Sequence, residues 1–187
     1  MVVVLAYNLK TLIRDHPVAT RFLLPLALSR FGGGLSGQIQ IRVERRAPFR
    51  RQRDILITWD LDELAVELDY VGIHDDLRRL DATDQSPDER TMKAAEVVAM
   101  VVMRLLVGAK FTGRAPRSRR SRPTFADFYL DDTQDKMIEV AGRASGDPGG
   151  LFRLKPKQIL RNSTLASAWV SVPVFMSRTN ATGRVKP

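Results

Sequence analysis

Two acidic residues in neighbouring apolar segments are the side chains of this sequence best suited to chemistry. Asp127 and Glu139 lie in short alternating segments that are separated by the polar residues 131–135. If these segments form a hairpin centred on Thr133, the two acids lie opposite each other on one face. Two carboxylates so placed repel each other unless a cation lies between them. Because one or two carboxylates commonly hold Mg²⁺ in phosphate chemistry, we expect Asp127 and Glu139 to be metal ligands.

A third acid could join this pair from a long helix. Residues 86–89 form a capping box with proline at the first helical position, and the apolar stretch that follows predicts a buried helix over 86–107. Glu96 lies in this helix, where a carboxylate is costly unless it is paired or bound to a metal. Two interpretations stay open: Glu96 belongs to the catalytic site, or it pairs with Lys93 three residues away.

The remaining patterns predict the elements that must position these acids. Together they indicate an α/β protein with a mixed sheet and a central buried helix. Pro173 favours an edge or a bulge in its strand, and the tail from Thr179 has no regular pattern. The expected elements are a proline-interrupted helix over 8–30, strands at 38–43, 54–59 and 65–73, the helix at 86–107, a hairpin of 126–130 and 137–141, a loop over 142–150, a short helix at 155–161 and a last strand at 168–176.

The order of these parts resembles the PD-(D/E)XK nuclease-like superfamily. That pattern has an acid on a helix, Asp on one strand, Glu-x-Lys on the next, and basic or Gln residues on the following helix. Glu96, Asp127 and Glu139 match the acids, and the resemblance covers roughly residues 86–176. It implies a restriction-endonuclease-like core over 86–187, preceded by a helix and strand region over 1–85 with an acidic middle.

The sequence departs from this pattern at one position. The family has lysine two residues after the glutamate, whereas this chain has Ala141. The resemblance allows a basic residue of a neighbouring element to take that role, and Lys155, Lys157 and Arg143 are the candidates. Without such a replacement, the fold would serve as a binding platform instead of an enzyme. The catalytic set implied by the resemblance is Glu96, Asp127, Glu139, Lys155 and Lys157.

The resemblance also implies a reaction. Asp127, Glu139 and the carbonyl of Val140 would hold Mg²⁺, which activates water and neutralises charge on a phosphate. A nearby lysine would act mainly as a positive point charge.

Positive charge is concentrated in two segments, residues 42–53 and 114–122. The chain carries 30 Lys and Arg against 21 Asp and Glu, a formal charge of +9, and this excess suggests a polyanionic partner. Arginine suits phosphate, and any such binding should depend on shape and salt more than on base sequence. A solvated loop is the alternative interpretation of both segments. The candidate nucleic-acid-binding residues are Arg45, Arg46, Arg50, Arg51, Arg53, Arg117, Arg119, Arg120 and Arg122.

Composition excludes several other classes. The chain has no cysteine and two histidines, which leaves no thiol nucleophile, no cysteine-based zinc site and little material for a triad. It has no P-loop motif, and its GxGxxG spacing over 32–37 follows a predicted helix rather than a strand. Acids at 60–63 and 74–76 are expected to cap helices and cover a solvated face. Because no segment has the pattern of an export or membrane signal, we expect a cytoplasmic location and no membrane partner.

Three functions are therefore expected to compete. The first is a nucleic-acid-associated protein with a nuclease-like fold that acts as a Mg²⁺-dependent phosphodiesterase on DNA or RNA. The second is a non-catalytic subunit that binds nucleic acid or protein within a larger complex. The third is a structural protein that assembles with a protein partner or with its own copies.

Overall fold

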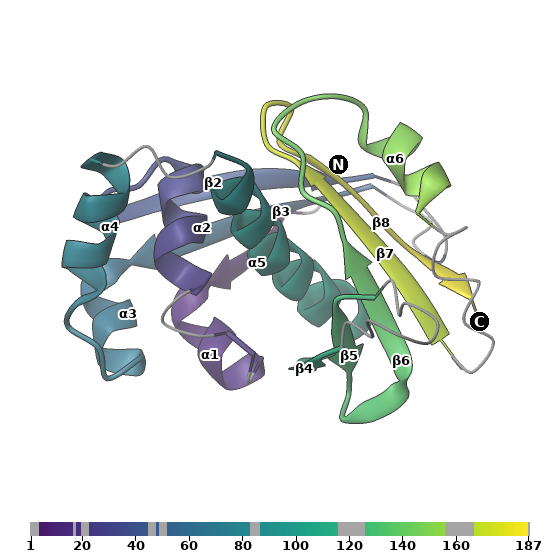
Figure 1. The fold of residues 1–187 in the computed structure, drawn as a ribbon, viewed down its shortest axis with the longest axis horizontal. Helices are drawn as coiled ribbons and strands as arrows, with labels where there is room; N and C mark the ends of the chain where they lie inside the picture. Colours follow the sequence, from purple (N-terminus) through teal and green to yellow (C-terminus); the bar gives the residue numbers. More distant parts are fainter. Residues whose placement is uncertain are drawn as a thin grey trace, which may run out of the picture.

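The computed structural model describes residues 4–16, 18–19, 23–44, 48, 52–82, 87–115, 126–155 and 167–186. The chain forms an α/β fold around one mixed sheet (Figure 1). The strands are β1 (Val4–Asn8), β2 (Ser36–Val43), β3 (Arg53–Asp60), β4 (Phe111–Arg114), β5 (Phe128–Leu130), β6 (Thr133–Val140), β7 (Ser167–Val174) and β8 (Thr179–Lys186). The helices are the 3-10 helix η1 (Leu9–Thr11), α1 (Leu12–Asp15), α2 (Leu23–Phe31), α3 (Leu61–Glu67), α4 (Ile73–Ala82), α5 (Pro87–Val107) and α6 (Pro148–Leu154).

The sheet brings together strands from both ends of the chain. Its eight strands have the order β1-β3-β2-β8-β7-β6-β5-β4. Strands β4 to β6 form an antiparallel meander, and β7 returns parallel to β6 after α6. On the other side, β8 pairs with β7 antiparallel and with β2 parallel. The expected boundary between 1–85 and 86–187 is therefore crossed by a continuous sheet.

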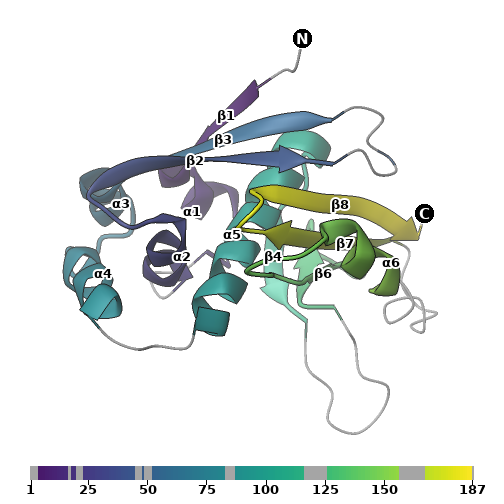
Figure 2. The same ribbon diagram turned by 90° about the horizontal axis from the view of Figure 1, so that it is seen from above.

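Helix α5 lies at the centre of the core, as the sequence predicted. Every residue from Ala94 to Met103 is buried, and α2 packs against α5. Helices α1 to α4 lie on one side of β1, β3 and β2 (Figure 2). Helix α6 packs on the opposite face of the sheet, against β7 and β8, and its Leu151 and Phe152 join the apolar cluster there. Among the described helices, none is long and apolar enough to cross a membrane.

The hairpin of β5 and β6 has the predicted register but a tighter turn. Asp131 and Asp132 both have positive φ, so the connection is a two-residue turn and not a five-residue loop. A register shift between Tyr129 and Leu130 then restores the pairing of Phe128 with Ile138. The faces are as expected: Phe128 and Ile138 lie in the core against α5, and the opposite face turns toward α6.

Two predictions for the N-terminal half were wrong. The alternating segment 65–73 is not a strand, because α3 and the start of α4 occupy it. The side chain of Asp60 caps α3 by accepting hydrogen bonds from the N–H groups of Asp62 and Glu63 at 3.0 and 3.1 Å. Residues 8–30 do not form one interrupted helix, since β1 ends at Asn8 and two short helices precede α2.

Three predictions for the C-terminal half were also wrong. The tail from Thr179 is strand β8, between β7 and β2. Pro173 consequently lies in an interior strand instead of at an edge. The expected loop 142–150 is interrupted by α6, which begins at Pro148, whereas the helix expected at 155–161 lies, from residue 156 on, outside the described residues. Asp147 caps α6 and Pro148 occupies its first position, a start signal that the neighbouring glycines concealed.

Candidate active site

Asp127, Glu139 and Lys155 line one pocket of about 570 Å³. The pocket lies where β6 ends, between the first turns of α5 and the end of α6. The structure thus brings together three of the five predicted catalytic residues from three different elements. The other lining residues are Asp88, Thr91 and Met92 of α5, Val140 of β6, and Ala141 to Ser145 of the loop that follows.

Backbone contacts of the hairpin fix the position of Asp127. This residue immediately precedes β5, and its N–H donates to the carbonyl of Ile138 at 2.9 Å. Its Oδ2 accepts a hydrogen bond from the N–H of Val140 at 2.8 Å. The carboxylate is therefore held beside the end of β6, next to Glu139.

Glu139 is a buried carboxylate with one cation against it. It is 8% exposed, and the Lys155 Nζ lies 2.6 Å from its Oε1. Lys155 reaches this position because it is the C-cap residue of α6, which packs on the same side of the sheet. The chain thus supplies a lysine from the end of α6 beside the glutamate, although the residue two positions after that glutamate is Ala141.

The electrostatics of Glu139 reflect two opposing influences. Burial, followed by repulsion from Asp127, raises the pKa of Glu139 to about 7, although Lys155 acts in the opposite direction. The positive charge of Lys155 does not fully compensate for two close carboxylates. Glu139 therefore takes up a proton more readily than a solvent-exposed carboxylate does.

Glu96 does not line this pocket. It is 6% exposed, and its carboxylate pairs with Lys93 at 3.1 Å and with Arg114 at 2.8 Å. The guanidinium of Arg114 also lies over the ring of Phe128 at 4.8 Å. Of the two interpretations that the sequence left open, the pairing with Lys93 is present in the structure.

The acid that α5 contributes to the pocket is Asp88, whose position in the sequence marks it only as part of a capping box. Asp88, Thr91 and Met92 lie at helical spacing on one face, so their common position was readable once the helix start was known. Gly142 is what lets the loop approach α5. A Cβ on this glycine would lie 2.7 Å from both the Thr91 carbonyl oxygen and the Ala95 Cβ.

Most of the predicted basic residues lie outside the described residues. These are Lys157, Arg45, Arg46, Arg50, Arg51, Arg117, Arg119, Arg120 and Arg122. Of the predicted nucleic-acid-binding set, the structure describes Arg53, which begins β3 and pairs in register with Val43 at the end of β2.

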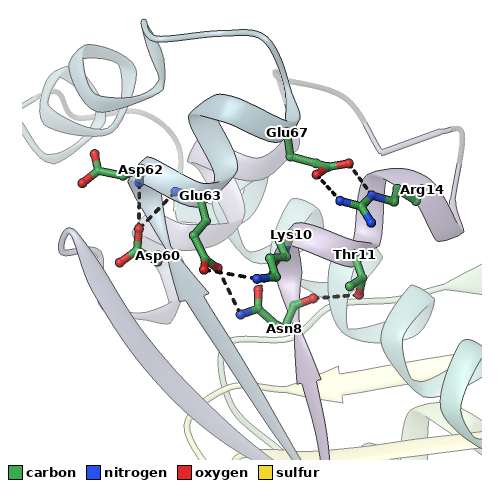
Figure 3. A network of polar contacts seen from close by, with 8 residues as sticks. All are labelled: Asn8, Lys10, Thr11, Arg14, Asp60, Asp62, Glu63 and Glu67. Atoms are coloured by element: carbon green, nitrogen blue, oxygen red, sulfur yellow. Dashed lines mark hydrogen bonds and ion pairs between the residues drawn. The ribbon is translucent and has the colours of Figure 1, made fainter.

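The acids at 60–63 form an ordinary surface network (Figure 3). Glu63 pairs with Lys10 at 3.1 Å, and Glu67 is bound by two nitrogens of Arg14 at 2.6 Å each. Asp60 caps α3, as described above. These acids have cationic or backbone partners, which agrees with the expected capping and surface roles.

The donor set in the pocket fits a divalent cation of the Mg²⁺ type. Across the described ranges, no group of three or more His, Asp or Glu side chains gathers at one point. Magnesium does not require such a group, because it keeps several waters and binds through one or two carboxylates. Asp127 and Glu139 meet that requirement.

Comparisons of the chain with protein-family models, with curated proteins and with solved structures found no match. The candidate site therefore stands on the geometry of its own residues.

Proposed function

We propose that this chain is a divalent-metal-dependent phosphodiesterase that acts on nucleic acid through a nuclease-like core. The observation that carries the proposal is the convergence of Asp127, Glu139 and Lys155 in one pocket, from a hairpin and a separate helix. The order of elements from α5 through β4, β5, β6 and α6 to β7 is consistent with the resemblance to the PD-(D/E)XK nuclease-like superfamily. The positive net charge supports a polyanionic substrate.

The residues divide the work of phosphodiester hydrolysis between them. Asp127 and Glu139 would hold Mg²⁺, and a bound divalent cation supplies a Lewis acid that activates water and neutralises phosphate charge. Asp127 is kept in position by the Val140 N–H, so it needs little rearrangement to act. Lys155 places a compact positive charge beside the same pocket, where it stabilises negative charge that develops on phosphate oxygens. In the overall reaction, water oxygen bonds to phosphorus and one P–O ester bond breaks.

A cleavage assay with carboxamide variants tests this proposal. Purified protein is incubated with labelled single- and double-stranded DNA and RNA in Mg²⁺ or Mn²⁺. We expect Glu139→Gln and Asp127→Asn each to lower the cleavage rate by a factor on the order of 10² or more, because one metal ligand is lost. Asp131→Asn is the matched control, since Asp131 lies in the turn at the far end of the same hairpin. Cleavage that survives Glu139→Gln would contradict the proposal.

A second candidate is a non-catalytic nucleic-acid-binding subunit. The direct ion pair between Lys155 and Glu139 favours this candidate, because the lysine already compensates part of the negative charge that a metal ion would otherwise neutralise. The same assay separates the two: binding of every probe with no cleavage in either metal would support the second candidate.

A further inference from the structure

The end of the sheet beside the pocket collects residues from both halves of the chain. Strands β6, β7 and β2 all end there, and β8 begins there between β7 and β2 (Figure 2). The cross-strand neighbours run from Arg143 to Val174, then to Thr179, and finally to Arg42. This row leads from Arg143, which lines the pocket, to Arg42 in the N-terminal half.

Three arginines lie along this row. Arg143 is exposed in the loop after β6, Arg178 is exposed in the turn between β7 and β8, and Arg42 is exposed near the end of β2. Arg143 and Arg178 have no ion-pair partner among the described residues. Arg42 faces Asp54 at 3.6 Å, yet 60% of its side chain is exposed. Two acidic residues lie close to this row: Asp54, the cross-strand neighbour of Arg42, and Glu44, two residues after Arg42.

Backbone hydrogen bonds fix the order of these arginines. The N–H of Phe175 donates to the carbonyl of Arg143 at 3.1 Å, which joins the pocket loop to the β7–β8 turn. The N–H of Arg42 donates to the carbonyl of Arg178 at 2.8 Å, which joins that turn to β2. The backbones of the three arginines therefore belong to one hydrogen-bonded framework rather than to independent loops.

The row is long enough to contact several successive phosphates of a nucleic-acid strand, and too long for a single phosphate group. Three strand spacings separate Arg143 from Arg42, or roughly 14 Å. Successive phosphates of one strand rise by about 3.4 Å along a duplex, so the row spans about four nucleotide steps. A mononucleotide in the pocket would reach Arg143 but not Arg42.

We infer that a nucleic-acid strand leaves the pocket over Arg143, follows the β7–β8 turn at Arg178 and reaches Arg42 at the end of β2. The N-terminal strands are then part of the substrate-binding surface of the pocket in the C-terminal half. This inference rests on the proposed function for the identity of the pocket, but it assigns a binding surface that catalysis alone does not require. The contacts are to phosphates, so they position the substrate without reading its sequence.

Salt-dependent binding tests the inference without any cleavage. Fluorescence anisotropy in EDTA gives the Kd of a labelled 20-base-pair DNA duplex and of a 20-nucleotide strand at several salt concentrations. We expect Arg143→Gln, Arg178→Gln and Arg42→Gln each to reduce the slope of log K against log salt by about 0.7 to 0.9, the loss of one phosphate contact. The matched control is Lys110→Gln, an exposed lysine beside the β5–β6 turn at the other end of β6.

The outcomes are distinct. Reduced slopes for all three arginine variants, with the slope of Lys110→Gln unchanged, would support the row as the binding surface. An unchanged slope for Arg42→Gln, or equal effects in all four variants, would overturn it. So would inorganic phosphate or a dinucleotide that competes as well as the 20-nucleotide strand. Because EDTA prevents metal-dependent turnover, a failure of cleavage would contradict the proposed function and leave this result unaffected.

Discussion

At the residue scale, Glu139 is a carboxylate that the folded chain holds at a cost. It is 8% exposed and close to Asp127, and both conditions disfavour its charged form. Lys155 at 2.6 Å offsets part of this cost. A residue kept under such conditions is typical of a functional site, where stability is given up for a reactive arrangement of charge.

The raised pKa of Glu139 leads to a stability prediction. A carboxyl group whose pKa is higher in the folded than in the unfolded state stabilises the fold at low pH, and this contribution is lost as pH rises through about 7. Glu139→Gln removes the charge, so we expect the variant to be more stable than the native chain at pH 8, by roughly 1–3 kcal/mol, and to differ little at pH 5. Urea unfolding of both proteins at pH 5 and pH 8 measures the difference in their free energies of unfolding.

A thermal-shift measurement extends the same test to the metal. Mg²⁺ should raise the Tm of the native chain at pH 8 and leave that of Glu139→Gln unchanged, because binding to the folded state alone stabilises it. Asp131→Asn should respond to Mg²⁺ as the native chain does. An equal shift in all three proteins would place the metal somewhere else.

His16 gives a pH prediction of opposite sign in another part of the core. It is fully buried, and its Nδ1 accepts a hydrogen bond from the N–H of Phe111 at 2.9 Å. Burial lowers the pKa of His16 to about 4. Between pH 6.5 and 4 the unfolded chain binds the extra proton, so stability falls as pH falls through this range, by up to roughly 3 kcal/mol.

The measurement is the free energy of unfolding of the native chain and of His16→Gln from pH 7 to pH 5. Subtracting the two curves removes contributions that both proteins share, including that of Glu139. We expect the native chain to lose more stability than the variant on acidification. Parallel curves would show that His16 does not titrate as its burial implies.

At the scale of elements, the contact between α5 and the loop after β6 defines the pocket. Gly142 has no room for a Cβ, since the Thr91 carbonyl oxygen and the Ala95 Cβ would both lie 2.7 Å from it. We expect Gly142→Ala to force the loop away from α5 and to destabilise the chain by roughly 1–3 kcal/mol. Cleavage should fall with it, since Arg143 and Ala141 line the pocket on either side.

Gly113→Ala is the matched control for this substitution. Gly113 lies in β4, and a Cβ there would meet the Tyr129 Cδ2 at an ordinary contact distance of 3.6 Å. Thermal unfolding of both variants should show a clear loss for Gly142→Ala and a small change for Gly113→Ala. A small change in both would mean that the loop adapts without cost.

Elements with a strong local signal were predictable, and elements defined by distant partners were not. The capping box and apolar run predicted α5, and the expected hairpin register is present in the pairing of Phe128 with Ile138. In contrast, β8 is polar, with Asn180 and Thr182 buried in a hydrogen-bonded group with Ser171. Only its place between β7 and β2 makes such a sequence a strand.

Helix α3 shows how an exposed apolar residue misleads. Val66 and Val71 are 83% and 86% exposed, and Val66 produced the alternation that predicted a strand. The buried residues Leu61, Leu64 and Ala65 follow the helical spacing instead. For the site, the hairpin acids could be predicted from local register, whereas the approach of Lys155 and Asp88 depends on how α6 and α5 pack.

At the scale of the whole molecule, the two halves share one sheet and one core. Strand β2 pairs with β8, and α2 of the N-terminal half packs against α5 of the C-terminal half. The main apolar cluster contains residues of both, including Leu24, Ile57, Val98 and Phe128. A shared core of this kind predicts that the halves unfold together and not as separate domains.

The two tryptophans allow each half to be observed separately. Trp59 is buried in β3 and Trp169 in β7, so Trp169→Phe leaves a probe of the N-terminal half and Trp59→Phe a probe of the C-terminal half. Because each substitution also changes stability, the fluorescence midpoint in urea is compared with the circular dichroism midpoint of the same variant. We expect the two midpoints to coincide in each variant. Separate midpoints would mean that 1–85 and 86–187 are independent units, in which case Arg42 could not hold a fixed position relative to the pocket.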